Sequence, residues 1–224
     1  MSHEQEKQLA ANESVKLVED GMIVGLGSGS TSAYMIRRLG ERVAKGLRIK
    51  GIPSSEKTKV LAIEHGITII SLDDAQIIDI NIDGADEFDP YLQLIKGGGG
   101  ALLREKIIAS NSKKNIIIVD SSKEVTRLGR FRLPIETIKF ATNKIISVLA
   151  EKGLDPKLRK TNDEIFRTDE NNYILDLNIL PFTNLAKLQQ DLISIPGIVE
   201  TGFFLDTTYQ VIMGKGHSAV IINK

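Results

Sequence analysis

The sequence predicts an α/β protein whose larger part is a mostly parallel sheet flanked by helices, joined to a smaller α+β part. Three observations lead to this prediction. Short apolar runs alternate with helical patterns as far as Gly129, the order changes after that residue, and a glycine-rich turn follows the first apolar run. Alternating strands and helices are typical of a parallel sheet covered on both faces. The 224 residues are enough for one large domain or two smaller ones.

The first elements follow this alternation from the start of the chain. Ser2 precedes Gln5 by three residues, which predicts a capping box, and apolar residues then recur at helical spacing until Gly21. A strand over 22–26, a glycine turn and a helix over 34–43 come next. Further strands are expected at 47–52, 67–70, 77–83 and 115–120. Together these elements predict a Rossmann-like sheet.

The pattern after Gly129 predicts a second, ferredoxin-like domain, because its elements follow the order β-α-β-β-α-β. Strands are expected at 132–138, 157–161, 173–179 and 198–205, and helices at 141–152 and around Leu185, Leu188 and Leu192. Two apolar runs of the tail, 209–213 and 219–222, are expected to return to the first sheet rather than extend the second domain. The predicted domains are residues 1–129 plus 206–224, which carry the catalytic site, and residues 130–205, which we expect to take part in oligomerisation.

Composition narrows the classes of function. Lysine plus arginine total 29 and aspartate plus glutamate total 29, so no basic field is present to hold nucleic acid or an acidic membrane. The absence of cysteine excludes disulfides, thiolate catalysis and cysteine-ligated metals. The first 16 residues are polar where a signal peptide needs an apolar core, and no apolar run is long enough to span a bilayer. We therefore expect a cytoplasmic protein.

The first candidate site is the turn Gly25-Leu26-Gly27-Ser28-Gly29-Ser30-Thr31, between the first strand and the second helix. Its glycines let backbone N–H groups close around an anion, the helix dipole attracts negative charge, and the serine and threonine hydroxyls add donors. A tight turn that needs only positive φ explains the segment equally well. Ser30 stands where a dinucleotide fingerprint requires glycine, and the segment is not a P-loop.

The second candidate is Asp83-Gly84-Ala85-Asp86-Glu87, directly after an alternating apolar strand. For Glu87 and Asp89 we favour solvated loop acids or a helix cap. For Asp83 and Asp86 we favour function, because ligands of open α/β sheets bind at the carboxyl ends of strands, the edge that also carries the glycine turn.

The third candidate is Lys96-Gly97-Gly98-Gly99-Gly100, which leads into an apolar helix containing Glu105. Four consecutive glycines are entropically costly, and a flexible linker rarely runs straight into a helix inside a domain, so close approach of the backbone to a ligand is favoured. Ala101, Ile108 and Ala109 flank Glu105 one turn away. On a partly dry face its pKa is expected to rise toward neutrality, which suits a general base.

The fourth candidate is Lys123, which follows the strand 115–120 and the segment Asp120-Ser121-Ser122. A lysine at the end of a strand can hold a phosphate, although a surface lysine is the commoner case. This assignment depends on the other three sites.

Together these motifs resemble ribose-5-phosphate isomerase of type A, whose signatures occur here in order at Gly27–Thr31, Asp83–Glu87, Lys96–Ala101 and Arg104–Lys106. The resemblance extends to Ser122-Lys123, Leu128-Gly129 and Ile195–Val199, and so covers almost the whole chain. The sequence departs from the family pattern at Asn171–Tyr173 and at Gly214–His217, outside the catalytic motifs.

The resemblance implies roles for individual residues. The catalytic base falls on Glu105. Substrate contacts fall on Ser28, Gly29, Ser30 and Thr31, on Asp83, Gly84, Ala85 and Asp86, on Lys96, Gly97, Gly98 and Gly99, on Lys123 and, by spacing alone, on Lys7. The implied partner is a small sugar phosphate of the non-oxidative pentose phosphate pathway, and the implied assembly is a homodimer or homotetramer.

An aldose–ketose isomerisation needs a proton removed beside a carbonyl and stabilisation of the enediolate oxygens. We expect Glu105 to move the proton between C2 and C1, Lys96 to stabilise the oxyanion, and Asp83 and Asp86 to assist ring opening and hydroxyl proton transfer. No cofactor is required. No metal is expected either, because His3, His65 and His217 are scattered singly.

Two other functions remain open. One is a non-catalytic sugar-phosphate sensor, which would need a DNA-binding module that the sequence does not show. The other is an acyl-CoA transferase or nucleotide-dependent enzyme that uses Glu105 as a nucleophile on a related fold.

Overall fold

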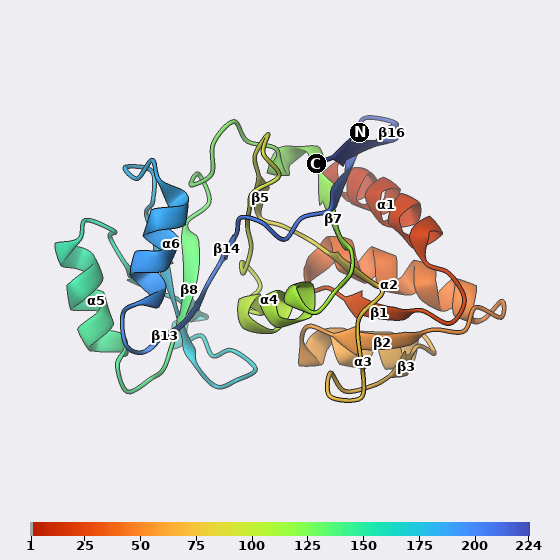
Figure 1. Cartoon of the computed structure of the whole chain (residues 1–224), viewed down its shortest axis with the longest axis horizontal. Coiled ribbons are helices and arrows are strands. Elements are labelled where there is room, and N and C mark those ends of the chain that lie inside the picture. The colour runs from red at the N-terminus through yellow and green to blue at the C-terminus, as the bar shows by residue number, and fades with distance from the viewer. Residues whose placement is uncertain (1) are drawn as a thin grey trace. The chain divides into compact units, whose positions relative to one another are not determined.

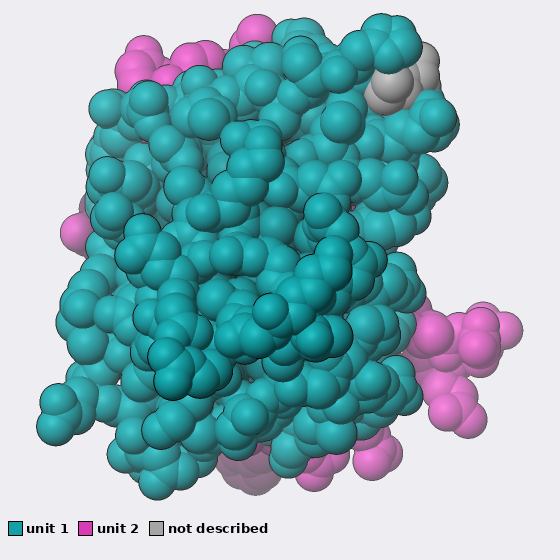
Figure 2. Space-filling view, turned by 90° about the vertical axis from the view of Figure 1, so that its right-hand side faces the viewer, with its two compact units in different colours: residues 1–85, 104–124, 206–224 teal, residues 86–103, 125–205 magenta. Residues whose placement is uncertain are grey.

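The structure is a computed structural model and describes residues 2–224 (Figure 1). The chain forms two compact units, which are coloured separately in Figure 2. The first unit consists of Met1–Ala85, Arg104–Glu124 and Asp206–Lys224. The second unit consists of Asp86–Leu103 and Val125–Leu205.

The first unit contains a seven-stranded sheet in the order β16-β15-β7-β4-β1-β2-β3. All neighbouring strands run parallel except β15 and β16, which form an antiparallel hairpin. The strands are β1 (Ile23–Leu26), β2 (Lys50–Pro53), β3 (Thr68–Ile69), β4 (Ile80–Asp83), β7 (Asn115–Asp120), β15 (Gln210–Lys215) and β16 (Ser218–Asn223). The predicted α/β class with a mostly parallel sheet is therefore confirmed, and the tail does contribute its two strands to this sheet.

Helices cover both faces of this sheet. The helices are α1 (His3–Ser14), α2 (Gly29–Val43), α3 (Glu56–Glu64) and α4 (Leu102–Ser110). Ala10 of α1 and Ile36 of α2 pack with Val24 and Ile82 of the sheet in one apolar cluster. Ile108 of α4 packs instead with Ile52 and Ile78, in a separate cluster. This two-sided burial explains why β7 is buried at every residue and carries the apolar run Ile116–Val119.

The second unit is built on an antiparallel sheet in the order β13-β8-β12-β9. Its strands are β8 (Leu133–Thr137), β9 (Lys157–Leu158), β12 (Tyr173–Leu177) and β13 (Ile198–Thr201), and its helices are α5 (Thr142–Glu151) and α6 (Leu185–Ile193). α5 contributes Ile145 and Leu149 and α6 contributes Leu188 and Leu192 to one core with the sheet. The chain order β-α-β-β-α-β confirms the ferredoxin-like prediction.

Two small sheets complete the second unit. One is β14-β6-β5, in which β6 (Leu94–Ile95) pairs with β14 (Phe203–Phe204) and β5 (Glu87–Phe88). Because of these pairings, residues 86–103 lie in the second unit, whereas the sequence pattern predicted them in the first domain. The other is the hairpin of β10 (Lys160–Thr161) and β11 (Glu164–Ile165). Strands of two residues leave no readable pattern in the sequence.

Two expected strands are interrupted. The strand predicted at 198–205 divides at Gly202, where a Cβ atom would lie 2.3 Å from the carbonyl oxygen of Lys96. The strand predicted at 157–161 divides at Arg159. The two departures from the family pattern leave their strands intact: Asn171 adopts a φ of 60° before β12, and Gly216 a φ of 57° between β15 and β16.

The helices also differ from the predicted ones at their ends. The capping box at the start of α1 is present: the Ser2 side chain accepts from the backbone of Gln5 and the Gln5 side chain accepts in return. α1 ends at Ser14 and continues as a 3-10 helix over Val15–Leu17. Among residues 2–224, no helix combines the length and the apolar character that crossing a bilayer requires.

Candidate active site

The glycine turn lies at the junction of β1 and α2 in the first unit. Ser28 is the N-cap of α2 in extended conformation, and Gly29 follows it with a φ of 89°. The Ser28 side chain makes no capping hydrogen bond, so it does not satisfy the first-turn N–H groups of α2. Ser30 is exposed and Thr31 half-buried in that first turn. A helix N-terminus of this kind favours an anion.

The Ser28 hydroxyl belongs to a group of hydroxyls at the ends of β1 and β2. Its Oγ lies 2.7 Å from the Oγ of Ser54, 3.1 Å from that of Ser55 and 3.3 Å from the Oγ1 of Thr58. Thr58 in turn donates to the carbonyl oxygen of Gly27 at 3.1 Å. These hydroxyls fix the turn. They were not among the predicted site residues, although Ser54 and Ser55 follow the strand predicted at 47–52 after a single proline.

Asp83 at the end of β4 is linked to the same turn. Its side chain is buried, and its Oδ1 accepts hydrogen bonds from the backbone N–H of Ser28 at 3.0 Å and of Gly84 at 2.8 Å. A Cβ atom at Gly27 would lie 2.1 Å from this oxygen. The glycine at position 27 is therefore required for Asp83 to approach the turn. The expectation that these two motifs meet at the carboxyl edge of the sheet is confirmed.

In the second unit, Asp86 lies against the glycine loop, which we define as residues 97–100. Its Oδ2 accepts from the backbone N–H of Gly98 at 2.7 Å, and its own N–H donates to Ile95 at 2.8 Å. Gly97 and Gly100 adopt φ values of 99° and 84°, in the region that favours glycine. A Cβ atom at Gly98 would lie 2.5 Å from the Asp86 carboxylate. The backbone conformation or the close neighbours of Gly97, Gly98 and Gly100 thus explain why these three positions are glycine.

Lys96 precedes this loop and is buried, with 3% of its surface exposed. Its backbone N–H donates to the carbonyl of Gly202 at 2.9 Å. Its ammonium group lies 5.4 Å from the centre of the Phe204 ring, within the range of a cation–π contact. A buried lysine held by backbone and aromatic contacts suits the stabilisation of a negative charge.

Glu105 lies in the first turn of α4 and is 5% exposed. α4 packs closely on the sheet at Ile108, and a Cβ atom at Gly25 of β1 would lie 2.7 Å from that side chain. The neighbouring Arg104 pairs with Glu56 at 2.9 Å. The buried position that the general-base hypothesis requires is therefore present. The shifted pKa expected of Glu105 stays a prediction.

The two lysines suggested for phosphate binding lie in the first unit. Lys123 is half-buried in the 3-10 helix η2 (Ser121–Lys123) after β7. Lys7 is in α1 and forms an ion pair with Glu4 at 2.6 Å. Of the predicted residues, hydrogen bonds join Ser28 to Asp83 in the first unit and Asp86 to Gly98 in the second.

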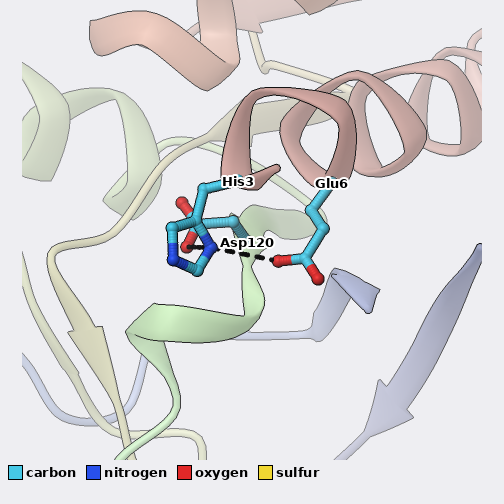
Figure 3. Close-up of side chains that lie close together, drawn as sticks. All are labelled: His3, Glu6 and Asp120. Carbon is cyan, nitrogen blue, oxygen red and sulfur yellow. Dashed lines mark hydrogen bonds and ion pairs between the residues drawn. The ribbon is translucent and has the colours of Figure 1, made fainter. Parts of the chain in front are cut away.

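One cluster of the first unit has the ligand types of a metal site. Atoms of His3, Glu6 and Asp120 lie within 4.8 Å of one another (Figure 3). The carboxylate oxygens already accept hydrogen bonds, those of Glu6 from Ser121 and Gly216 and Oδ1 of Asp120 from Ser122. His3 is exposed and the two acids are buried. These bonds explain the cluster as a structural link between α1 and the end of β7.

Comparisons of the sequence with known proteins give one consistent result. The family described as ribose 5-phosphate isomerase A (phosphoriboisomerase A) matches residues 50–218. Ribose-5-phosphate isomerase A of Lactiplantibacillus plantarum is 45% identical, with 99% of this chain and 98% of the relative covered. The protein of the same name from Bacillus anthracis is 52% identical, with 93% and 95% covered.

Solved structures give the same result. A D-ribose-5-phosphate isomerase in complex with phospho-erythronic acid superposes with a TM-score of 0.96 at 40% identity, over 100% of both chains. The ribose 5-phosphate isomerase A of Methanocaldococcus jannaschii gives 0.95 at 38% identity, also over 100% of both chains.

The relatives and solved structures that match this chain over nearly its whole length are named as isomerases. This protein is therefore an isomerase built on a mostly parallel α/β sheet. The resemblance of its four motifs to one family is confirmed. The chain belongs to the ribose 5-phosphate isomerase A family.

Proposed function

We propose that the chain interconverts D-ribose 5-phosphate and D-ribulose 5-phosphate through an enediolate, with Glu105 as the general base. Family membership supports the substrate. The observation that carries the mechanism is the burial of Glu105 on a helix packed against the sheet, because a carboxylate shielded from water is a stronger base than one in solution.

The proton transfer runs in two steps. The Glu105 carboxylate removes the proton from C2 of the open-chain aldose, and the C–H electron pair forms the C1–C2 double bond of an enediolate whose negative charge lies on O1. The protonated Glu105 then returns the proton to C1, while the hydroxyl proton of O2 is transferred to O1. The product is the ketose, and the enzyme regains its starting state without a redox change.

Lys96 and the glycine loop supply the charge stabilisation that we propose. Lys96 and the surrounding backbone N–H groups that are not already bonded to Asp86 or within the loop bind the developing oxyanion. Preorganised donors in a water-poor environment are effective here, since they need no rearrangement as charge develops. Lys96 is buried and the loop is hydrogen-bonded to Asp86, which supports a fixed arrangement.

The aspartates and the phosphate contacts complete the proposal. Asp83 and Asp86 assist ring opening and carry hydroxyl protons between oxygens. The first turn of α2, Lys123 and Lys7 bind the phosphate, and this remote binding energy positions C1 and C2 against the base. One family member binds phospho-erythronic acid, which is a phosphorylated sugar acid, and that supports a phosphate subsite in this chain.

The setting of the activity is part of the same proposal. We place the reaction in the non-oxidative pentose phosphate pathway and the protein in the cytoplasm. We propose a homodimer or homotetramer in which the ferredoxin-like domain takes part in assembly. The reaction requires neither a cofactor nor a metal.

The test is turnover of ribose 5-phosphate in EDTA without added cofactor, compared between the parent protein, Glu105→Gln and Glu64→Gln. Glu64 is an exposed residue at the end of α3 and serves as the matched control. We expect kcat of Glu105→Gln to fall by about 10²- to 10⁴-fold, the range for loss of a general base, with phospho-erythronic acid still bound. Parent activity with an equally active Glu105→Gln would refute the assignment of the base.

A parent protein that binds ribose 5-phosphate but does not convert it would favour the sugar-phosphate sensor instead. Formation of a glutamyl thioester with an acyl-CoA would favour a transferase. Neither outcome is expected from the family to which the chain belongs.

A further inference from the structure

We propose that Arg159 is a positioning residue for the reaction, because it holds the glycine loop in the conformation that binds the substrate and the oxyanion. The inference deepens the proposed function and rests on it. All residues involved belong to the second unit, and the sequence pattern indicated for Arg159 only a place in a predicted strand.

Arg159 binds the carbonyl side of the loop. Its Nη1 donates to the carbonyl oxygen of Gly97 at 2.8 Å and to that of Gly98 at 3.1 Å. The other side of the guanidinium pairs with Asp176 of β12, with Nε donating to Oδ2 at 2.9 Å and Nη2 donating to Oδ1. The side chains of Arg159 and Asp176 are 13% and 20% exposed. A planar fork of fixed donors can make all these contacts at once.

Asp86 binds the opposite side of the same peptide group. The carbonyl of Gly97 and the N–H of Gly98 belong to one peptide unit, which Arg159 therefore holds at its oxygen and Asp86 at its nitrogen. No cis peptide bond occurs in residues 2–224, so C=O and N–H point in opposite directions in each unit. Because Arg159 also binds the carbonyl of Gly98, the N–H of Gly99 points away from Arg159.

This arrangement gives the loop a defined donor side and a defined acceptor side. The carbonyls face Arg159, and the N–H groups of Gly98 and Gly99 face the other way. The N–H of Gly98 donates to Asp86, so the N–H of Gly99 is the donor of this pair that we assign to the oxyanion. An oxyanion needs N–H donors and is repelled by carbonyl oxygens, so the orientation of these peptides decides whether the loop can stabilise it. Arg159 sets that orientation without touching the substrate.

The loop needs such an anchor because glycine supplies no side chain to fix it. Two of its residues have positive φ, and unrestrained glycines sample many other conformations. Phe166 adds a second restraint: a Cβ atom at Gly100 would lie 2.4 Å from its ring, and the Arg159 guanidinium lies 5.8 Å from the ring centre. Arg159, Asp176 and Phe166 thus form one support for the loop.

The experiment compares Arg159→Met with Arg132→Met. Arg132 is a matched control because it too binds two backbone carbonyls and a carboxylate in the second unit. Its Nε donates to the Asp176 carbonyl at 3.1 Å, and its Nη2 donates to the Asp155 carbonyl and to the Asp155 carboxylate, the latter at 3.0 Å. Both variants lose one guanidinium of the same unit. Values of kcat, KM and the midpoint of thermal unfolding are measured for each.

For Arg159→Met we expect kcat/KM to fall by about 10- to 100-fold at a temperature where the protein is fully folded, the cost typical of misplaced binding groups. Both kcat and KM are expected to change, because the loop contacts the substrate in the ground state as well as the oxyanion that forms during the reaction. Arg159→Lys should recover little, since an ammonium group cannot bind two carbonyls and Asp176 in this geometry. Arg132→Met should keep kcat/KM within about threefold even if it unfolds at a lower temperature.

Amide hydrogen exchange separates positioning from general stability. Exchange at Gly98 and Gly99 should accelerate in ligand-free Arg159→Met and not in Arg132→Met. A folded Arg159→Met with parental kcat/KM, or an equal loss of activity in Arg132→Met, would overturn the inference. Those results leave the proposed function intact. An inactive parent or a fully active Glu105→Gln defeats the proposed function, and the exchange rates at Gly98 and Gly99 then still decide whether Arg159 fixes the loop.

Discussion

The carboxylate of Glu6 in α1 accepts two hydrogen bonds from Ser121, one from its backbone N–H at 3.1 Å and one from its hydroxyl at 2.7 Å. The N–H of Gly216 donates to the other carboxylate oxygen at 3.0 Å. Glu6 thereby joins α1 to the segment after β7 and to the β15–β16 turn. These bonds, led by the Ser121 hydroxyl, lower the pKa of Glu6 from 4.5 to about 2.

We predict that Glu6→Gln lowers the free energy of unfolding by about 1 to 3 kcal/mol at neutral pH, the range for hydrogen bonds to a charged group. Because the pKa of Glu6 is lower in the folded state, its contribution is present above about pH 4.5 and is lost as the pH falls toward about 2. Urea unfolding at several pH values checks this. Glu13→Gln, which breaks only an ion pair with Lys16 on the same helix, should change stability by under about 1 kcal/mol.

The contribution of Glu136 in β8 to stability changes with pH in the opposite direction. It is buried, and its Oε1 accepts from Thr168 and Asn172 at 2.9 Å each. Burial is the largest effect and raises its pKa above 4.5. Its contribution to stability is therefore present below pH 4.5 and is lost as the pH rises through the folded-state pKa, with a slope of at most about 1.4 kcal/mol per pH unit.

We accordingly expect Glu136→Gln to gain stability relative to the parent between pH 4 and pH 8, because glutamine carries no charge to bury and can still accept both hydrogen bonds. Unfolding free energies of the two proteins measured across that interval provide the check. A constant difference over the whole interval would show that burial of the charge at position 136 has no thermodynamic weight.

The turn at the end of β1 provides a steric test. Gly27→Ala would place a Cβ atom 2.5 Å from the backbone of Asp83, so the turn or the end of β4 must shift. We expect a loss of about 1 to 3 kcal/mol of stability, typical of overpacking, and at least a tenfold fall in kcat/KM. In Gly84→Ala the added Cβ atom has no neighbour closer than 3.7 Å, and its unfolding temperature should match the parent within a few degrees.

The larger part of the fold could be predicted from the sequence, because apolar runs and turn residues indicate strands and helices from neighbouring residues alone. The continuous apolar run of β7 predicted a strand covered on both faces, and the glycine turn after β1 predicted the start of α2. Asp83 could be linked to Ser28 without any pairing information, since parallel strands end at the same edge of the sheet.

The remaining features depend on long-range pairing that a single sequence does not reveal. The two-residue strands β5 and β6 have no periodicity, and they assign residues 86–103 to the second unit only through β14, more than 100 residues later. Arg159 reads as an ordinary strand residue, because its contacts with Gly97 and Gly98 come from distant parts of the chain. The link from Glu6 to Ser121 is hidden for the same reason.

The central claim, that Glu105 moves the proton between C2 and C1, is tested most directly by isomerisation in D₂O followed by NMR. The rate at which solvent deuterium enters C1 of ribulose 5-phosphate and C2 of ribose 5-phosphate is measured with the parent protein and with Glu105→Gln. We predict that the parent incorporates deuterium and that the variant loses incorporation and net conversion in parallel, by about 10²- to 10⁴-fold. Deuterium incorporation by folded Glu105→Gln at the parental rate would contradict the account.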